Sequence, residues 1–214
     1  MNAKDFEIQY WQQYILLEKE LLQTDKYVTI SPDNYPTYSS AYGKLLLEIG
    51  SEIDIVSKTL CCFLGDTNAS IITEYANSIT TQFPEFTSIS VEVLNRSLII
   101  QPWNNWTSTN SPLWWQAHNK YKHDRLGSWK GKDNYKWANL ENTISSLAGL
   151  FQIEVYTFYE LVKNQNDSSK TPMPGSRLFI LKGDKWDNVE FSQDFSLYIN
   201  NKGQLMLEMG MFQY

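Results

Sequence analysis

The chain has 214 residues, of which 42% are hydrophobic and 14% aromatic, and its formal net charge is -6 at pH 7. This length allows one large domain or one domain with a smaller appendage, and the hydrophobic content suffices for a packed core, which excludes a disordered chain. The acidic balance excludes a protein whose whole surface attracts nucleic acid or anionic membrane. A polar N-terminus and the lack of any run of about 18 apolar residues predict a cytoplasmic protein with no membrane partner.

Five stretches space their apolar residues by three or four, which is the period of an amphipathic helix. They are residues 5–22, 39–64, 67–82, 112–124 and 135–163. Pro32 and Pro36 interrupt the chain after the first stretch and predict a loop there. Residues 102–111 are expected to form an irregular aromatic loop, and residues 126–134, with two glycines, an exposed turn.

Strand patterns occur in two places. Residues 89–93 and 98–100 are rich in β-branched side chains on either side of Asn95-Arg96, which predicts a small hairpin near residues 88–101. Residues 176–214 alternate or run apolar between turn residues, which predicts a small β meander packed on the helices. Residues 164–175 are expected to link this meander to a helical domain of residues 1–163. The predicted fold class is α+β, mainly an α-helical bundle with a small C-terminal antiparallel β-sheet.

Cysteine and histidine usage argues against a metal or cofactor. Cys61 and Cys62 are adjacent on a predicted helix, where a disulfide would be strained and a zinc site would lack its other ligands, so both are expected to be buried reduced thiols. His118 and His123 do not have the i,i+4 spacing that places two imidazoles on one metal. Sequence signatures of phosphate-binding loops, dinucleotide folds, serine hydrolases and zinc proteases are absent from the chain. We therefore expect no metal and no cofactor.

The densest chemistry lies in residues 112–125, P-L-W-W-Q-A-H-N-K-Y-K-H-D-R. Helical geometry places six of these side chains on one arc of roughly 160°. With one acid from the longest apolar pattern, they form the candidate ligand-binding set: Trp115, His118, Asn119, Lys122, His123, Arg125 and Glu52. In such a set cations supply charge for an anion, arginine a planar fork, asparagine orientation and histidine a mobile proton. We expect Lys122, His123 and Arg125 to face a shared polar cleft between the two long helices, near Glu48 or Glu52.

A structural interpretation of the same residues stays open. Six lysines and arginines fall within residues 120–136 against only Asp124 and Asp133, and such a run is either an anion-binding patch or a solvated face. Trp114 and Trp115 are either core rings or base-stacking platforms. In the structural alternative, the polar side chains lock the helical bundle through Glu48, Glu52 or Asn139.

The run from Trp115 to Arg125 matches W-x-x-[YH]-N-x-x-K-H-x-R, a segment of uncharacterised bacterial α-helical proteins. Over about residues 5–163 the chain resembles the HEPN superfamily (higher eukaryotes and prokaryotes nucleotide-binding). The resemblance implies two long antiparallel helices, the motif just before the last of them, and a role in defence or in a toxin-antitoxin system. Ribonuclease members of the superfamily use R-x(4–6)-H, whereas the arginines of this chain, Arg96, Arg125 and Arg177, do not precede a histidine at that spacing. The resemblance therefore implies a nucleotide-binding scaffold more than an enzyme.

Two functional hypotheses from different classes follow. In the first, the chain is a bacterial HEPN-like protein that binds a nucleotide, RNA or another anionic ligand without ribonuclease activity. In the second, it is a non-catalytic helical module whose aromatic surface binds a protein partner or a second copy of the chain. Phosphate contacts weaken steeply with salt and aromatic protein interfaces do not, so the salt dependence of nucleotide binding separates the two.

Overall fold

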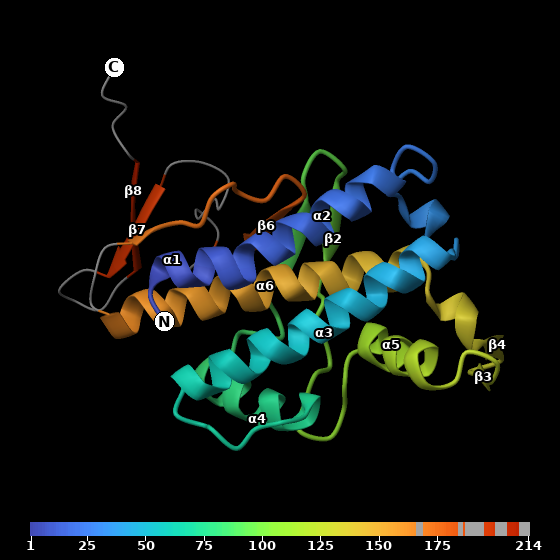
Figure 1. Ribbon diagram of the computed structural model, residues 1–214, viewed down its shortest axis with the longest axis horizontal. Coiled ribbons are helices and arrows are strands. Elements are labelled where there is room, and N and C mark those ends of the chain that lie inside the picture. The colour runs from blue at the N-terminus through green and yellow to red at the C-terminus, as the bar shows by residue number, and fades with distance from the viewer. Residues whose placement is uncertain (166–168, 184–185, 187–194, 200–204, 210–214) are drawn as a thin grey trace.

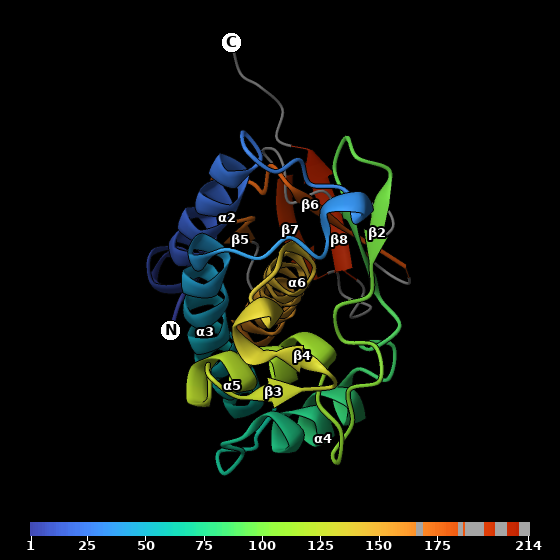
Figure 2. The same ribbon diagram turned by 90° about the vertical axis from the view of Figure 1, so that its right-hand side faces the viewer.

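The central element of the fold is the helix α6 (Leu140–Gln165), which Figure 2 shows nearly end-on with α2 and α3 on one side of it and β6 and β2 on the other. The computed structural model describes residues 1–165, 169–183, 186, 195–199 and 205–209. Every side chain from Asn142 to Val162 is buried except those of Ser145 and Tyr159, which are half-buried. A helix that is apolar on nearly all faces is stable only inside a core, and this position provides one. The structure confirms the α+β class, mainly helical with a small antiparallel sheet.

The N-terminal helical pattern is confirmed as one continuous rod. It consists of α1 (Ala3–Phe6), a π-helical turn (Glu7–Trp11) and α2 (Gln12–Thr24), drawn in dark blue in Figure 1. Asn2 caps its start, because the Asn2 side chain accepts the Asp5 N–H at 2.9 Å and the Asp5 carboxylate accepts the Asn2 N–H at 3.1 Å.

The two long helices run in the same direction, so the predicted antiparallel pair is wrong. The second helix, α3 (Ser40–Phe63), is capped by the Ser39 hydroxyl and begins beside the start of α6. Ser39 donates its N–H to Ala138 O at 3.3 Å, and Leu140 donates to Thr37 O at 2.9 Å. Both helices proceed from this shared end in Figure 1, whereas α2 runs the opposite way. The predicted helix start at Tyr135 is a 3-10 turn (Asn134–Trp137) instead, and α6 follows it.

Two shorter helices complete the bundle: α4 (Ile72–Gln82) and α5 (Leu113–His123). Both lie within the predicted stretches, with later starts. Both cysteines were predicted to be buried. Cys61 is buried, whereas Cys62 is exposed, so the prediction is wrong for Cys62, and both are free thiols. None of the helices within the described residues is long and apolar enough to cross a membrane.

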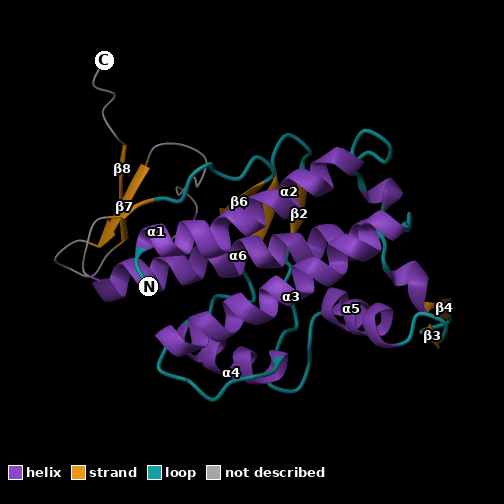
Figure 3. Cartoon of the chain, in the orientation of Figure 1, coloured by secondary structure: helices purple, strands orange, loops and turns teal. Residues whose placement is uncertain are grey.

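The predicted hairpin near residues 88–101 is confirmed. The strands β1 (Ser90–Val93) and β2 (Leu98–Ile100) pair antiparallel, and Asn95 and Ser97 take positive φ angles of 61° and 48° in the turn between them. A third strand, β6 (Phe179–Lys182), pairs antiparallel with the other edge of β1 and gives the sheet order β2-β1-β6. The first strand of the predicted C-terminal meander therefore belongs to the same sheet as this hairpin (Figure 3).

Residues 173 and 174, inside the predicted linker of residues 164–175, and residues 177 and 178 after it have fixed partners on the N-terminal helical rod. Trp11 donates its indole N–H to Pro174 O at 2.7 Å, and Gln12 donates to Met173 O at 2.8 Å. The buried Glu18 carboxylate accepts the N–H groups of Arg177 at 2.9 Å and Leu178 at 3.2 Å. These bonds hold the segment that leads into β6 against the first helical rod.

A second small antiparallel sheet lies near the end of α6 (Figure 1). Its order is β5-β7-β8, formed by β5 (Ser169–Lys170), β7 (Phe195–Ile199) and β8 (Leu205–Met209). Residues 184–185, 187–194, 200–204 and 210–214 of the predicted meander lie outside the described residues. The predicted exposed turn at residues 126–134 contains a hairpin of β3 (Ser128–Trp129) and β4 (Lys132–Asp133), with Lys130 and Gly131 at positive φ.

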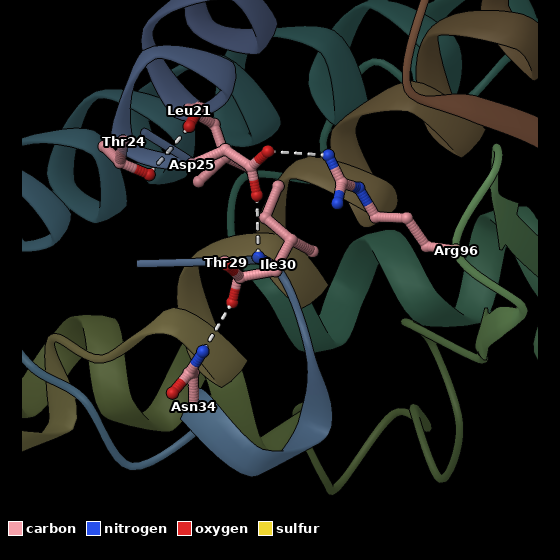
Figure 4. A network of polar contacts seen from close by, with 7 residues as sticks. All are labelled: Leu21, Thr24, Asp25, Thr29, Ile30, Asn34 and Arg96. Carbon is pink, nitrogen blue, oxygen red and sulfur yellow. Dashed lines mark hydrogen bonds and ion pairs between the residues drawn. The ribbon is translucent and has the colours of Figure 1, made fainter. Parts of the chain in front are cut away.

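A polar contact ties the loop after α2 to the β1–β2 turn (Figure 4). The Asp25 carboxylate accepts a hydrogen bond from Arg96 and another from the Ile30 N–H, each at 2.8 Å. Because both sides of this ion pair are about a quarter exposed, its contribution to stability is of the order of 1 kcal/mol or less.

Candidate functional site

Two glycines on α3 allow α5 to approach it closely. A Cβ atom built on Gly43 would lie 2.1 Å from the Tyr121 hydroxyl, and one built on Gly50 would lie 2.6 Å from the His118 ring. The two glycines are seven residues apart, so they share one face of α3. This face is therefore where the polar segment of residues 112–125 meets a long helix, as Figure 1 and Figure 2 both show for α5 and α3.

A groove of about 490 Å³ lies between the two helices. We call it the α3–α5 groove, and its lining side chains come from both helices: Leu47, Gly50, Ser51, Asp54 and Ile55 of α3, and Trp115, His118, Asn119 and Lys122 of α5. Four of the seven predicted site residues are therefore brought together. They occupy positions i, i+3, i+4 and i+7 of α5, which is a single helical stripe.

His118 forms the inner wall of the groove as a neutral ring. It is 4% exposed, its ring centroid lies 5.1 Å from that of Trp115, and its Nδ1 atom is buried with no hydrogen-bond partner among the described residues. Burial and then the Lys122 charge lower the pKa of His118 to about 4. At neutral pH His118 therefore contributes shape and a ring face, and it does not supply the mobile proton that was expected of it.

The rest of the lining mixes donors, acceptors and one cation. Ser51, Asn119 and Lys122 lie at or near the groove surface, and Asp54 accepts the Tyr75 hydroxyl at 3.1 Å through one carboxylate oxygen. Within the described residues, Lys122 makes no ion pair and no hydrogen bond. Its ammonium group is thus available to an anion at the mouth of the groove.

His123 and Arg125 lie outside the groove. The predicted cleft that Lys122, His123 and Arg125 share between the two long helices is therefore wrong, and of the three only Lys122 lines the groove. α5 ends at His123, which is exposed, and Arg125 follows the helix. Arg125 donates to Tyr121 O at 3.2 Å and holds its guanidinium 4.5 Å from the Tyr121 ring centroid. The two long helices pack directly on each other, and the groove lies between α3 and the shorter α5.

Glu52 lies on a different face of α3 from the groove lining. It is half-buried, burial raises its pKa, and its charge acts on Glu154 of α6. Glu48, the other predicted neighbour, lies 3.7 Å from Lys44 in an ion pair. The predicted structural lock is not observed within the part of the chain that the structure describes, because neither Lys122 nor His123 bonds to Glu48, Glu52 or Asn139.

The cations of residues 120–136 gather around the end of α5 and the β3–β4 hairpin. Within the described residues, only Lys136 among them forms an ion pair, with Asp133 at 2.9 Å. Two others lie over exposed or half-buried indoles, with Lys130 4.5 Å from the Trp129 ring centroid and Lys132 4.8 Å from that of Trp137. Cation–π contacts of this kind fix the position of a charge without neutralising it.

Sequence reasoning missed the α3 side of the groove. Ser51 and Asp54 belong to a helix whose pattern was interpreted only through its apolar stripe, and the two glycines were not used. Their spacing of seven inside a long predicted helix is the signal that could have found this face, since glycine in a helix interior costs about 1 kcal/mol and indicates close approach.

The described residues hold no group of three or more His, Cys, Asp or Glu side chains placed to bind a metal ion. Comparisons of the chain with models of protein families, with curated proteins and with solved structures found no match. The geometry of the α3–α5 groove and the charge around it therefore carry the functional argument alone.

Proposed function

We propose that the α3–α5 groove binds a nucleotide or a nucleotide of single-stranded RNA, without ribonuclease activity. The observation that carries this proposal is the position of Lys122, which lines the groove, forms no ion pair with any described residue and stands at the edge of a larger group of cations. Clustered, unneutralised lysines on an otherwise acidic protein attract phosphate groups.

The lining suits a base better than a simple anion. Trp115 presents an indole beside the His118 ring, and aromatic surfaces of this kind stack on any base. Ser51, Asp54 and Asn119 supply the donors and acceptors that the edge of a base requires. A volume of about 490 Å³ lies within the usual range of small-ligand sites.

Cleavage of RNA needs a histidine that exchanges protons near neutral pH beside a cation that holds the phosphate. The pKa of His118 is about 4, and Nδ1 is buried, while His123 is exposed outside the groove. This arrangement supports binding and argues against the metal-free ribonuclease route. The relation to the HEPN superfamily and a role in bacterial defence stay predictions.

Fluorescence anisotropy of a labelled single-stranded RNA, measured at about 50 and 200 mM salt, tests the proposal. We expect binding that weakens with salt, and a Lys122→Ala variant whose salt slope is smaller by about one. Lys58→Ala is the matched control, because Lys58 is an exposed lysine of α3 that does not line the groove. Equal binding by Lys122→Ala and Lys58→Ala, or no RNA binding by a folded protein, would contradict the proposal.

The alternative, a protein-binding module, has one specific observation in its favour. A shallow groove between α2 and α3 is lined by Leu16 and Tyr27, which are 54% and 88% exposed. Exposed apolar side chains of this size are typical of protein contact sites. A folded protein that binds no RNA, and whose binding to a protein is lost in Leu16→Ser, would favour this second function.

A further inference from the structure

A second pocket lies beside the first turn of α5, between the loop of residues 101–112 and the start of α6. It encloses about 560 Å³, and most of its polar lining is uncharged. We call it the amide pocket, after the six amide side chains that line it: Gln101, Asn104, Asn105, Asn110, Gln116 and Asn142. None of these residues belongs to the α3–α5 groove.

The loop that forms one wall of the amide pocket has a fixed shape. Its tryptophans and the tryptophan that follows it are buried, and each donates its indole N–H to a backbone carbonyl: Trp103 to Gly149 at 3.2 Å, Trp106 to Ile72 at 3.0 Å and Trp114 to Pro102 at 2.6 Å. A polar loop anchored at three points loses little conformational entropy when a ligand arrives. The wall is therefore preorganised for binding.

The amides themselves are also oriented. Three of them donate to backbone carbonyls: Asn110 to Asn105 O at 2.6 Å, Gln116 to Ser111 O at 2.7 Å and Asn142 to Trp137 O at 2.9 Å. Among the described residues, no hydrogen bond uses the side-chain oxygens of these three amides. Each amide thus keeps a free acceptor and a second N–H in a fixed plane.

The charges around the pocket indicate which ligand class it accepts. Lys130 and Glu141 are its two charged lining residues, and their opposite signs leave the pocket without net charge. A hydroxyl group both donates and accepts, and an amide offers one group of each kind to it. Leu113, which also lines the pocket and is 42% exposed, adds an apolar surface for the carbon face of a ring.

We propose that the amide pocket binds a neutral, hydroxyl-rich small molecule of the saccharide class. This site is separate from the nucleotide site proposed above and does not depend on it. A phosphorylated or carboxylated ligand would leave a charge facing uncharged amides, whereas a neutral sugar ring pairs its hydroxyls with them and rests its carbon face on Leu113.

Saturation-transfer NMR tests this directly. The full chain is mixed with methyl glycosides of glucose, galactose and mannose and with N-acetylglucosamine, and separately with glucose 6-phosphate, glucuronate and arginine. We expect signal transfer to at least one neutral sugar and none to the charged compounds. The loss of one hydrogen bond in Gln116→Ala should weaken binding by about threefold to tenfold.

Gln82→Ala is the matched control, since Gln82 is an exposed glutamine of α4 outside the pocket. It should bind the sugar as the wild type does, and so should the groove variant Lys122→Ala. Circular dichroism of each variant establishes that the fold is intact. The proposal is overturned by the absence of transfer to every neutral sugar, by preferred transfer to a charged compound, or by unchanged binding in both Gln116→Ala and Asn110→Ala.

Discussion

Two faces of α3 place their polar side chains in different surroundings, one in an open groove and the other against the core. On the face toward α5, Gly50 gives way to the His118 ring, and Ser51 and Asp54 line an open groove. On the face toward α6, the charge of Glu52 acts on Glu154, whose two carboxylate oxygens are buried with no hydrogen-bond partner among the described residues. The first face leaves polar groups available to a ligand, whereas the second buries an acid that the fold must keep neutral. Polar residues on one helix can therefore belong to two unrelated structural settings.

The largest expected effect concerns Glu154. Burial and then the Glu52 charge raise the pKa of Glu154 well above its usual value. The charge of Glu154 in turn is one of the causes that raise the pKa of Tyr14 on α2. A carboxyl whose pKa is raised on folding keeps its proton in the native state at a pH where the unfolded state has lost it. The free energy of unfolding should therefore fall as pH rises above about 4.5, by roughly 1.4 kcal/mol for each pH unit up to the raised pKa. In Glu154→Gln this decline should disappear.

Urea denaturation between about pH 7 and pH 8.5, where His118 is neutral in the folded and unfolded states and adds no slope, measures this effect. Glu18→Gln is the control, because the buried Glu18 carboxylate accepts hydrogen bonds from Tyr14 and from backbone N–H groups. That variant should lose about 2 kcal/mol by giving up these bonds, without removing the pH-dependent decline. A wild-type protein with flat stability over this range would show that Glu154 is not held neutral.

His118 should produce a dependence of opposite sign on the other face. Its pKa falls to about 4 in the fold, so the neutral ring stabilises the protein above about pH 6.5, and this stability is lost as pH falls. Measured as the difference between the wild type and His118→Asn, this loss should be about 2 kcal/mol between pH 7 and pH 5, because the opposite effect of Glu154 is common to both proteins. His123→Asn, at an exposed position, serves as the control and should retain the dependence.

A smaller effect tests the close approach of the two helices. Alanine in place of glycine stabilises an exposed helix by about 1 kcal/mol, but in Gly50→Ala the added Cβ would lie 2.6 Å from the His118 ring. We expect a loss of about 1 to 3 kcal/mol instead. In a His118→Ala background the same substitution should become neutral or stabilising, and thermal unfolding of the four proteins gives the cycle. Stabilisation by Gly50→Ala in the wild type would mean that α5 does not press on this face.

The smallest effect is expected for the open side of the groove. Lys122 is exposed and makes no ion pair with any described residue, so Lys122→Ala should change the free energy of unfolding by no more than about 0.5 kcal/mol. Chemical denaturation provides the measurement, and Lys44→Ala is a useful comparison, because Lys44 pairs with Glu20 at 3.0 Å. A large loss in Lys122→Ala would assign Lys122 a structural role and weaken the ligand proposal.

Sequence periodicity predicted the helices and the β1–β2 hairpin, because apolar spacing and β-branched content act locally. It does not give the relative direction of α3 and α6, because an apolar stripe is the same for either direction and the connection between the helices decides it. The antiparallel direction came from the resemblance and is wrong. Periodicity did not identify Glu154 as a buried acid, because the apolar residues around it in the sequence are the same whether its side chain points to the core or to solvent.

For the candidate site, the sequence predicted too many residues of α5 on the side that faces α3. Of these, Trp115, His118, Asn119 and Lys122 line the groove, while α5 ends at His123 and Arg125 follows it. Glu52 was predicted to lie beside the α5 residues, whereas it acts on Glu154 of α6, because its neighbour depends on how α3 packs. Gly43 and Gly50 could have predicted which face of α3 contacts α5, since close packing of two helices requires small residues at their contact.

The most direct test of the ligand proposal is to observe Trp115 during a titration with AMP. Indole N–H signals of the protein are recorded by two-dimensional NMR, and a Trp115→Phe variant identifies the signal of that residue. We predict that the Trp115 signal shifts most, that the buried Trp103 and Trp106 signals stay in place, and that Lys122→Ala reduces the shift at equal AMP concentration. A Trp115 signal that does not move, while AMP shifts other indoles or none, would contradict a ligand seated between α3 and α5.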